Sequence, residues 1–318
     1  MEIFAKLRKI MKNHRKFGKI SIRIHIFARN DIITENISIM DILLTNDDGY
    51  RAKGIQVLAE IMKEFGNVTV IAPKQHQSGM SMAISMNRRP LAYRKTGQSE
   101  GISWAYLDAT PASCVKFALN NIFTGKKPDV VVSGINHGSN AATAACYSGT
   151  LGAVAEAALN GIPGIGVSLD TNDADADFSS VEKYFPGIFR KLAGIRPAGY
   201  GIYYNINFPG SEAEEIKGTR VASQGMGKWI KEFLPWNAET LQRLGIPPET
   251  AGQAVEEAGP GEELYIMTGE FTDDERNPED ADHRLNKKGY ITVVPHRIDC
   301  TDYAECERLI KAGIEVTF

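Results

Sequence analysis

The sequence predicts an α/β protein built on a mostly parallel, doubly wound sheet. Three apolar runs rich in β-branched residues punctuate the first half of the chain, at Ile42–Leu44, Val68–Pro73 and Asp129–Ser133. Helix-compatible stretches separate them, at 54–65 and 112–123. Buried parallel strands joined by helical crossovers have this pattern. We therefore expect a Rossmann-like sheet covered by helices.

Later segments extend this prediction and then depart from it. Further strands are expected at 163–169 and 202–208, further helices at 151–159 and 178–193, and a hairpin within 88–107. After Gly210 the alternation of strands and helices stops. Strand-like runs at 219–223, 264–268 and 290–295 are separated by a long polar stretch, 229–261. This pattern predicts a C-terminal β-hairpin or arm extension.

We therefore divide the chain into three parts. Residues 1–39 form a basic N-terminal extension, which we expect not to be part of the fold. Residues 40–210 form the α/β core that carries the predicted metal site. Residues 211–318 form the C-terminal extension, which is expected to act as an oligomerisation arm.

Composition narrows the class of protein. The 318 residues are 43% hydrophobic and 24% charged, as in ordinary globular proteins. Residues 1–39 hold nine Lys or Arg and three Asp or Glu, so the remainder is acidic, with a net charge near −9. An acidic body argues against binding to a nucleic-acid duplex.

Cysteine usage and hydropathy favour a cytoplasmic protein. The four cysteines include no Cys-x-x-Cys pair, so a zinc site is not expected, and Cys114 and Cys146 are predicted to be core thiols. No apolar run reaches the length of about 18 residues that a transmembrane helix needs. We expect no membrane association.

A cluster of oxygen ligands follows the first predicted strand. Asn46, Asp47, Asp48 and Gly49 come directly after it. Adjacent carboxylates repel each other unless a cation or a proton separates them. The same four residues also suit a solvated turn. Because parallel strands end at one edge of a sheet, we expect the two aspartates to meet residues that follow the other strands, Ser78 and Asn136.

Several ordered motifs resemble the SurE family of survival nucleotidases. They are Thr45–Gly49, Ala72-Pro73 with Ser78-Gly79, Thr110-Pro111 with Cys114-Val115, Val132–Asn136, Tyr147–Thr150, Asn205–Asn207 and Gly289–Val293. The resemblance implies that Asp47, Asp48, Ser78 and Asn136 bind one divalent metal ion per subunit. It also implies nucleoside 5′- or 3′-monophosphate substrates and a homodimer or homotetramer.

The residue types agree with this chemistry. Two carboxylates, a hydroxyl and an amide form an all-oxygen ligand set that suits Mg²⁺ or Mn²⁺. We therefore expect metal-assisted hydrolysis of a phosphate monoester, in which Asp47 or Asp48 orients the attacking water. His76 and His137 flank the predicted ligands; each is either a neighbouring proton donor or a surface histidine without a role.

The start of the helix after Tyr147 is a candidate phosphate site. Ser148, Gly149 and Thr150 precede an Ala-rich helical stretch, and helix N-termini bind anions. The same residues would equally serve as an ordinary helix cap. Asn46 is either a further phosphate donor or a residue that bonds its own turn.

Other functions remain as alternatives. A phosphatase acting on a non-nucleotide monoester or a short polyphosphate would use the same ligands. A non-catalytic metal-binding module would be expected to have lost a ligand, and none of the four is altered. A nicotinamide oxidoreductase would need a glycine where Leu169 stands after Gly164 and Gly166.

Overall fold

The computed structural model describes residues 39–86, 90–99, 101–171, 173, 175–246, 258–315 and 317. The predicted N-terminal extension, residues 1–39, therefore lies outside the described residues except for Ile39. Within the described part of the chain, no helix is both long enough and apolar enough to cross a membrane.

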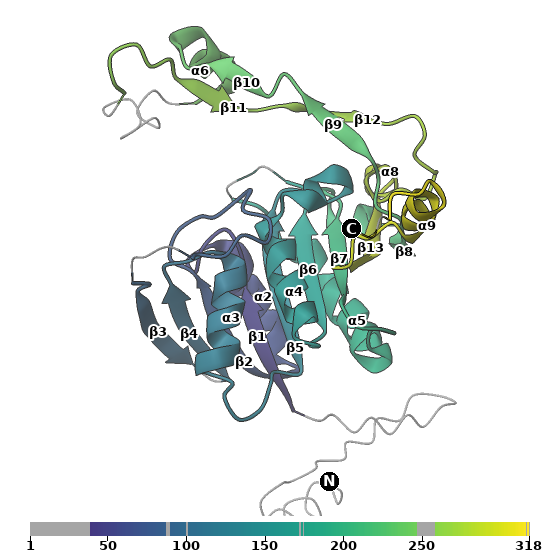
Figure 1. Cartoon of the computed structure of the whole chain (residues 1–318). Coiled ribbons are helices and arrows are strands. Elements are labelled where there is room, and N and C mark those ends of the chain that lie inside the picture. Colours follow the sequence, from purple (N-terminus) through teal and green to yellow (C-terminus); the bar gives the residue numbers. More distant parts are fainter. Residues whose placement is uncertain are drawn as a thin grey trace, which may run out of the picture.

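In the described residues, one nine-stranded sheet forms the centre of the molecule, in the order β3-β4-β2-β1-β5-β6-β7-β13-β8 (Figure 1). The strands are β1 (Met40–Thr45), β2 (Gly66–Pro73), β3 (Tyr93–Ser99), β4 (Ile102–Leu107), β5 (Val130–His137), β6 (Gly164–Leu169), β7 (Ile202–Phe208), β8 (Gly218–Val221) and β13 (Tyr290–Arg297). All neighbours from β4 to β7 pair in parallel, while β3 and β13 run antiparallel to β4 and β7. The predicted mostly parallel α/β sheet is confirmed.

Helices cover both faces of this sheet. On one face lie α2 (Lys53–Lys63) and α5 (Ser179–Ile195), and on the other α3 (Pro111–Asn121) and α4 (Gly149–Leu159). Because successive side chains of a strand point to opposite faces, Ile42 and Leu44 pack in the first core and Leu43 in the second. This double burial explains the continuous apolar runs in the sequence.

The predicted core thiols differ in their environment. Cys114 is fully buried in α3, as expected. Cys146 is exposed, so the prediction was wrong for this residue. It ends a short 3₁₀ helix, η1 (Ala142–Cys146), which lies in the connection from β5 to α4. The small residues around it suggested a core position, but they belong to a surface connection.

The C-terminal extension has two structural parts. Strands β8 and β13 join the central sheet, with β13 next to β7. The described residues 227–246 and 258–273 form an arm with two short antiparallel ladders above the sheet edge (Figure 1). The arm contains β9 (Gly227–Ile230), β10 (Phe233–Pro235), α6 (Ala238–Leu244), β11 (Tyr265–Met267) and β12 (Glu270–Asp273). It is followed by α8 (Asp282–Lys287), and α9 (Tyr303–Lys311) lies near the end of the chain.

A buried carboxylate ties the base of the arm to the body. Asp282, at the start of α8, is fully buried. Its oxygens accept the N–H of Ala142 at 3.0 Å, of Gly225 at 2.9 Å and of His283 at 2.8 Å. Gly225 lies just before β9, and Ala142 begins η1. One side chain therefore fixes the arm's root against the segment that leads to α4.

We expect Asp282→Ala to lower the free energy of unfolding by roughly 3 kcal/mol, because it leaves three buried N–H groups without an acceptor. Urea denaturation measures the change. Glu279→Ala is the control, since its carboxylate is exposed and its pair with Lys288 lies in solvent. Equal losses in the two variants would contradict the role given to Asp282.

Candidate functional site

The predicted ligands lie at the carboxyl ends of three adjacent strands. Asp47 follows β1, Ser78 follows β2, and Asn136 lies near the end of β5. Strand β1 pairs with both β2 and β5, so the three strands are neighbours. The chain winds outward in opposite directions from β1, which makes this position a topological switch point, where open α/β sheets bind ligands.

A cavity of about 410 Å³ opens at this point. Asp47, Ser78 and Asn136 line it, together with Ser148 from the start of α4. The structure thus brings together residues that lie far apart in the sequence, as the parallel-sheet argument predicted. Asp48 does not line the cavity.

Asp47 is the most perturbed acid of this region. Its side chain is almost fully buried, and Thr150 holds both carboxylate oxygens: the hydroxyl donates to Oδ1 at 2.6 Å and the N–H to Oδ2 at 3.2 Å. Burial raises the pKa of Asp47 to about 6, and the Asp48 charge adds to the rise, although the Thr150 hydrogen bonds oppose it. A carboxylate with this pKa favours a nearby cation.

Gly149 is required by the position of Asp47. A Cβ atom on Gly149 would lie 2.9 Å from Asp47 Cβ and 3.0 Å from Asp47 Oδ2. Ser148 caps α4, because its hydroxyl accepts the N–H of Leu151 at 3.1 Å. The helix start was predicted as a phosphate site. In the structure it first holds a protein carboxylate, so the positive end of the α4 dipole acts on Asp47.

Asp48 lies between two histidines. Its Oδ1 is 3.5 Å from His76 Nδ1, and its Oδ2 is 3.6 Å from His137 Nδ1. The N–H of His137 also donates to Oδ2 at 3.4 Å. Because His137 follows Asn136 directly, Asp48 lies close to that predicted ligand although it does not line the cavity. Both histidines are thus neighbours of the predicted metal site.

The remaining predicted residues differ in their present partners. Ser78 is exposed at the cavity wall. The amide nitrogen of Asn136 donates to the carbonyl of Gly138 at 2.7 Å. The amide oxygen is the atom of this side chain that suits a cation. Asn46 is buried and closes its own turn, donating to the Gly49 carbonyl and accepting the Gly49 N–H. Its contact with a phosphate stays a prediction.

A buried network of asparagines holds the loop beside the cavity. Asn140 donates its N–H to Asn207 Oδ1 and its side-chain amide to Ser168 Oγ, both at 2.8 Å, and Asn205 donates to the Asn140 carbonyl at 2.8 Å. The Asn-x-Asn pair of β7 was visible in the sequence. The structure shows that it positions the loop after β5.

The arm supplies a cavity wall that sequence reasoning missed. Four arm residues line the cavity: Trp229 from β9, Glu232 from the turn after it, and Met267 and Thr268 from the end of β11 and the residue after it. These residues lie in what the sequence presented as a polar stretch and a short strand. No local pattern marks them, because their position depends on where the arm lies over the sheet.

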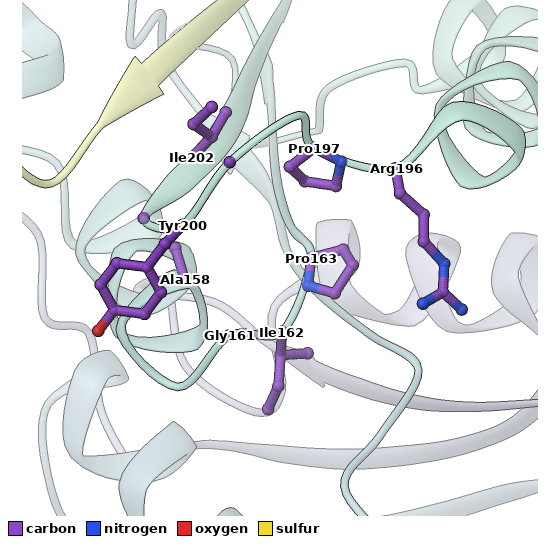
Figure 2. A pocket seen from close by; sticks show the side chains of 10 residues that line it. Ala158, Gly161, Ile162, Pro163, Arg196, Pro197, Tyr200 and Ile202 are labelled. Atoms are coloured by element: carbon purple, nitrogen blue, oxygen red, sulfur yellow. The ribbon is translucent and has the colours of Figure 1, made fainter.

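A second cavity lies at the opposite edge of the sheet, before β6 and β7. Its volume is about 280 Å³, and Arg196, Pro163 and Tyr200 are among its lining residues (Figure 2). No carboxylate lines it. It therefore offers no anionic ligands for a cation, and the chemistry at the carboxyl edge has no counterpart there.

The donor set determines which cation would fit. Among the described residues, no group of three or more His, Cys, Asp and Glu side chains is arranged to hold a metal ion. The predicted set contains only two acids and relies on a hydroxyl and an amide for its other protein oxygens. Such a set suits a hard cation that keeps several waters.

Comparison with known proteins agrees with this geometry. A family model described as "Survival protein SurE" matches residues 42–231. A 5′-nucleotidase SurE from Phocaeicola vulgatus is 37% identical over 275 residues, which cover 86% of this chain and 97% of that protein. A 5′-nucleotidase SurE from Flavobacterium psychrophilum is 34% identical over 270 residues, covering 84% and 95%.

A solved structure shares the fold. The crystal structure of the SurE protein from Aquifex aeolicus superposes with a TM-score of 0.67 at 29% identity and covers 86% of this chain and 99% of that one. The family match, the two relatives and the shared fold lead to one conclusion: the chain belongs to the SurE family.

Proposed function

We propose that this protein is a 5′-nucleotidase that hydrolyses nucleoside monophosphates to nucleoside and phosphate in the cavity at the carboxyl edge of the sheet. Its relatives are named 5′-nucleotidase SurE. The observation that carries the proposal is the buried carboxylate of Asp47, which lines a cavity with Ser78 and Asn136 and has Asp48 beside it in the chain. Hydrolysis of 3′-monophosphates is part of the same proposal.

The residues present fit one divalent metal ion, Mg²⁺ or Mn²⁺. Asp47, Asp48, Ser78 and Asn136 would hold it, because they provide hard oxygens and an anionic charge that burial makes costly without a counter-ion. A bound divalent ion supplies positive charge for the phosphoryl oxygens and makes a nearby water more acidic.

The chain's own residues would perform the remaining tasks. Thr150 keeps Asp47 oriented and favours its ionised form. The Ser148 side chain and the backbone of Gly149 would meet the phosphate at the start of α4. One of the two aspartates would orient the attacking water. His76 and His137 are placed to exchange protons near Asp48.

We further propose a cytoplasmic homodimer or homotetramer. The support is the arm: Phe233, Tyr265 and Met267 project from it and are each more than half exposed. Apolar side chains at the end of a projecting hairpin are typical of contact surfaces between subunits.

Phosphate release from a panel of nucleoside monophosphates tests the function and its metal dependence. We expect turnover with Mg²⁺ or Mn²⁺ and none in chelator. Asp48→Asn should lower turnover on the order of 10²-fold or more, because one charge of the ligand set is lost. Added Mn²⁺ should raise the melting temperature of the wild type and that of the variant much less.

Asp280→Asn is the matched control for that substitution, since Asp280 is exposed and far along the chain from the site. It should keep wild-type turnover and the full stabilisation by Mn²⁺. Wild-type turnover by Asp48→Asn, or turnover that persists in chelator, would contradict the metal-dependent assignment.

The pKa of Asp47 predicts how pH affects the metal-free protein. Burial raises this pKa from 3.8 to about 6, so the folded state binds the proton more tightly than the unfolded chain. In chelator, this group therefore adds stability as the pH falls from above 6 toward 4, by about 3 kcal/mol at most. Asp47→Asn should lack this dependence and exceed the wild type in stability at pH 7.5. Urea melts at several pH values measure both; parallel curves would contradict the prediction.

Thr150 provides a matched pair of variants. Thr150→Val keeps the shape but removes the hydroxyl that donates to Asp47 at 2.6 Å. The pKa of Asp47 should then rise further, so the acid limb of the pH–rate profile should move to higher pH and metal affinity should fall at neutral pH. Thr150→Ser keeps the donor and should behave like the wild type. If both variants lost activity equally, the hydroxyl would not be the cause.

A further inference from the structure

The cavity has two walls of different chemistry. The body contributes Asp47, Ser78 and Asn136, which suit a cation and a phosphate. The arm contributes Trp229 and Met267 to the lining. A nucleoside monophosphate has the same division, with an anionic phosphate at one end and at the other a flat base whose π-faces can stack on an aromatic ring.

Trp229 is held in a fixed position. Its ring packs edge-to-face on Phe271, with centroids 5.7 Å apart, and the two residues are cross-strand partners in the β9–β12 ladder. Gly269 packs against the indole, because a Cβ there would lie 3.1 Å from Trp229 Cε3. Yet 37% of Trp229 remains exposed. Folding of the arm alone therefore does not bury this ring.

The arm's root is fixed relative to the phosphate side of the cavity. Gln224 donates to the Ala142 carbonyl at 3.2 Å, and Asp282 joins Ala142 to Gly225. Met226 and Asn277 exchange two hydrogen bonds, of 2.8 and 2.6 Å. The root of the wall that carries Trp229 is thus anchored to the segment that leads into Ser148.

We propose that Trp229 is the platform on which the nucleobase stacks, which makes the arm the specificity-determining wall of the site. Glu232 and Thr268, which line the same wall, would meet the polar edge of the base or the ribose hydroxyls. This role of Trp229 rests on the proposed 5′-nucleotidase function, and it would explain why the substrates carry a base. Stacking on an aromatic ring tolerates every base, because each base has a flat π-face.

The test compares substrates with and without a base. Trp229→Ala should raise the KM for AMP on the order of tenfold or more, with little change in kcat. Its kcat/KM for ribose 5-phosphate, which has the phosphate but no base, should stay at the wild-type value. Trp229→Phe should restore most of the affinity for AMP. Tyr303→Ala, an exposed aromatic residue of α9 outside the cavity lining, is the control and should match the wild type.

A binding measurement separates this inference from the proposed function. Titration calorimetry with adenosine, which has no phosphate group to hydrolyse, measures the affinity of the base subsite without turnover. Adenosine should bind the wild type on the order of tenfold more tightly than Trp229→Ala. If adenosine binding depended on Trp229 but the protein hydrolysed no nucleotide, the stacking role of Trp229 would stand and the proposed nucleotidase activity would be wrong.

Two other results would overturn the platform. If Trp229→Ala lowered kcat/KM equally for AMP and ribose 5-phosphate, the indole would support the arm and not the base. If the variant bound adenosine as tightly as the wild type, no stacking would occur at this position, even with full nucleotidase activity.

Discussion

The burial of one carboxylate, Asp47, determines how the rest of the site is built. Removing this charge from water is costly, and Thr150 offsets part of the cost through its hydroxyl and its N–H. The close approach excludes any side chain at residue 149. The position of α4, the glycine at its start and the hydroxyl that follows are therefore consequences of where β1 ends. The part of this desolvation cost that Thr150 does not offset would be reduced by a bound cation, so it favours cation binding.

A second buried carboxylate, Asp282, performs a comparable task for the other wall. It gathers three N–H groups from η1, from the root of the arm and from α8. Asp47 thus places a negative charge at the carboxyl edge of the sheet. Asp282 holds the root of the arm, which lies above that edge. Asp282 accepts three backbone N–H groups, and Asp47 accepts one backbone N–H and one hydroxyl, both from Thr150. Backbone donors cost little side-chain entropy because they are already ordered. The carboxylate at the sheet edge and the root of the arm are therefore both fixed by internal hydrogen bonds.

The sequence predicted the sheet and the meeting of Asp47, Ser78 and Asn136 because both follow from a general rule: parallel strands end at one edge. It did not predict that the start of α4 would hold Asp47, since Ser148 to Thr150 look the same whether they cap a helix or bind a phosphate. Strand β13 was visible as an apolar run, but its antiparallel position beside β7 was not, because strand order depends on tertiary packing. Trp229 was missed for the same reason: its role depends on the path of the arm, and no local periodicity encodes that path.

The division of the cavity between body and arm has a consequence for how such a site can change. The metal and phosphate side depends on backbone geometry at Asp47 and Gly149, where even one added carbon atom would collide. The base side depends on a ladder of only a few residues, in which Trp229 and Phe271 support each other and Gly269 accommodates the indole. Substitutions in the arm can therefore alter which molecule carries the phosphate without disturbing the chemistry that removes it. A broad preference among bases follows from the same arrangement, because stacking on an aromatic ring rewards any flat base, while Glu232 and Thr268 of the same wall could distinguish one base edge from another.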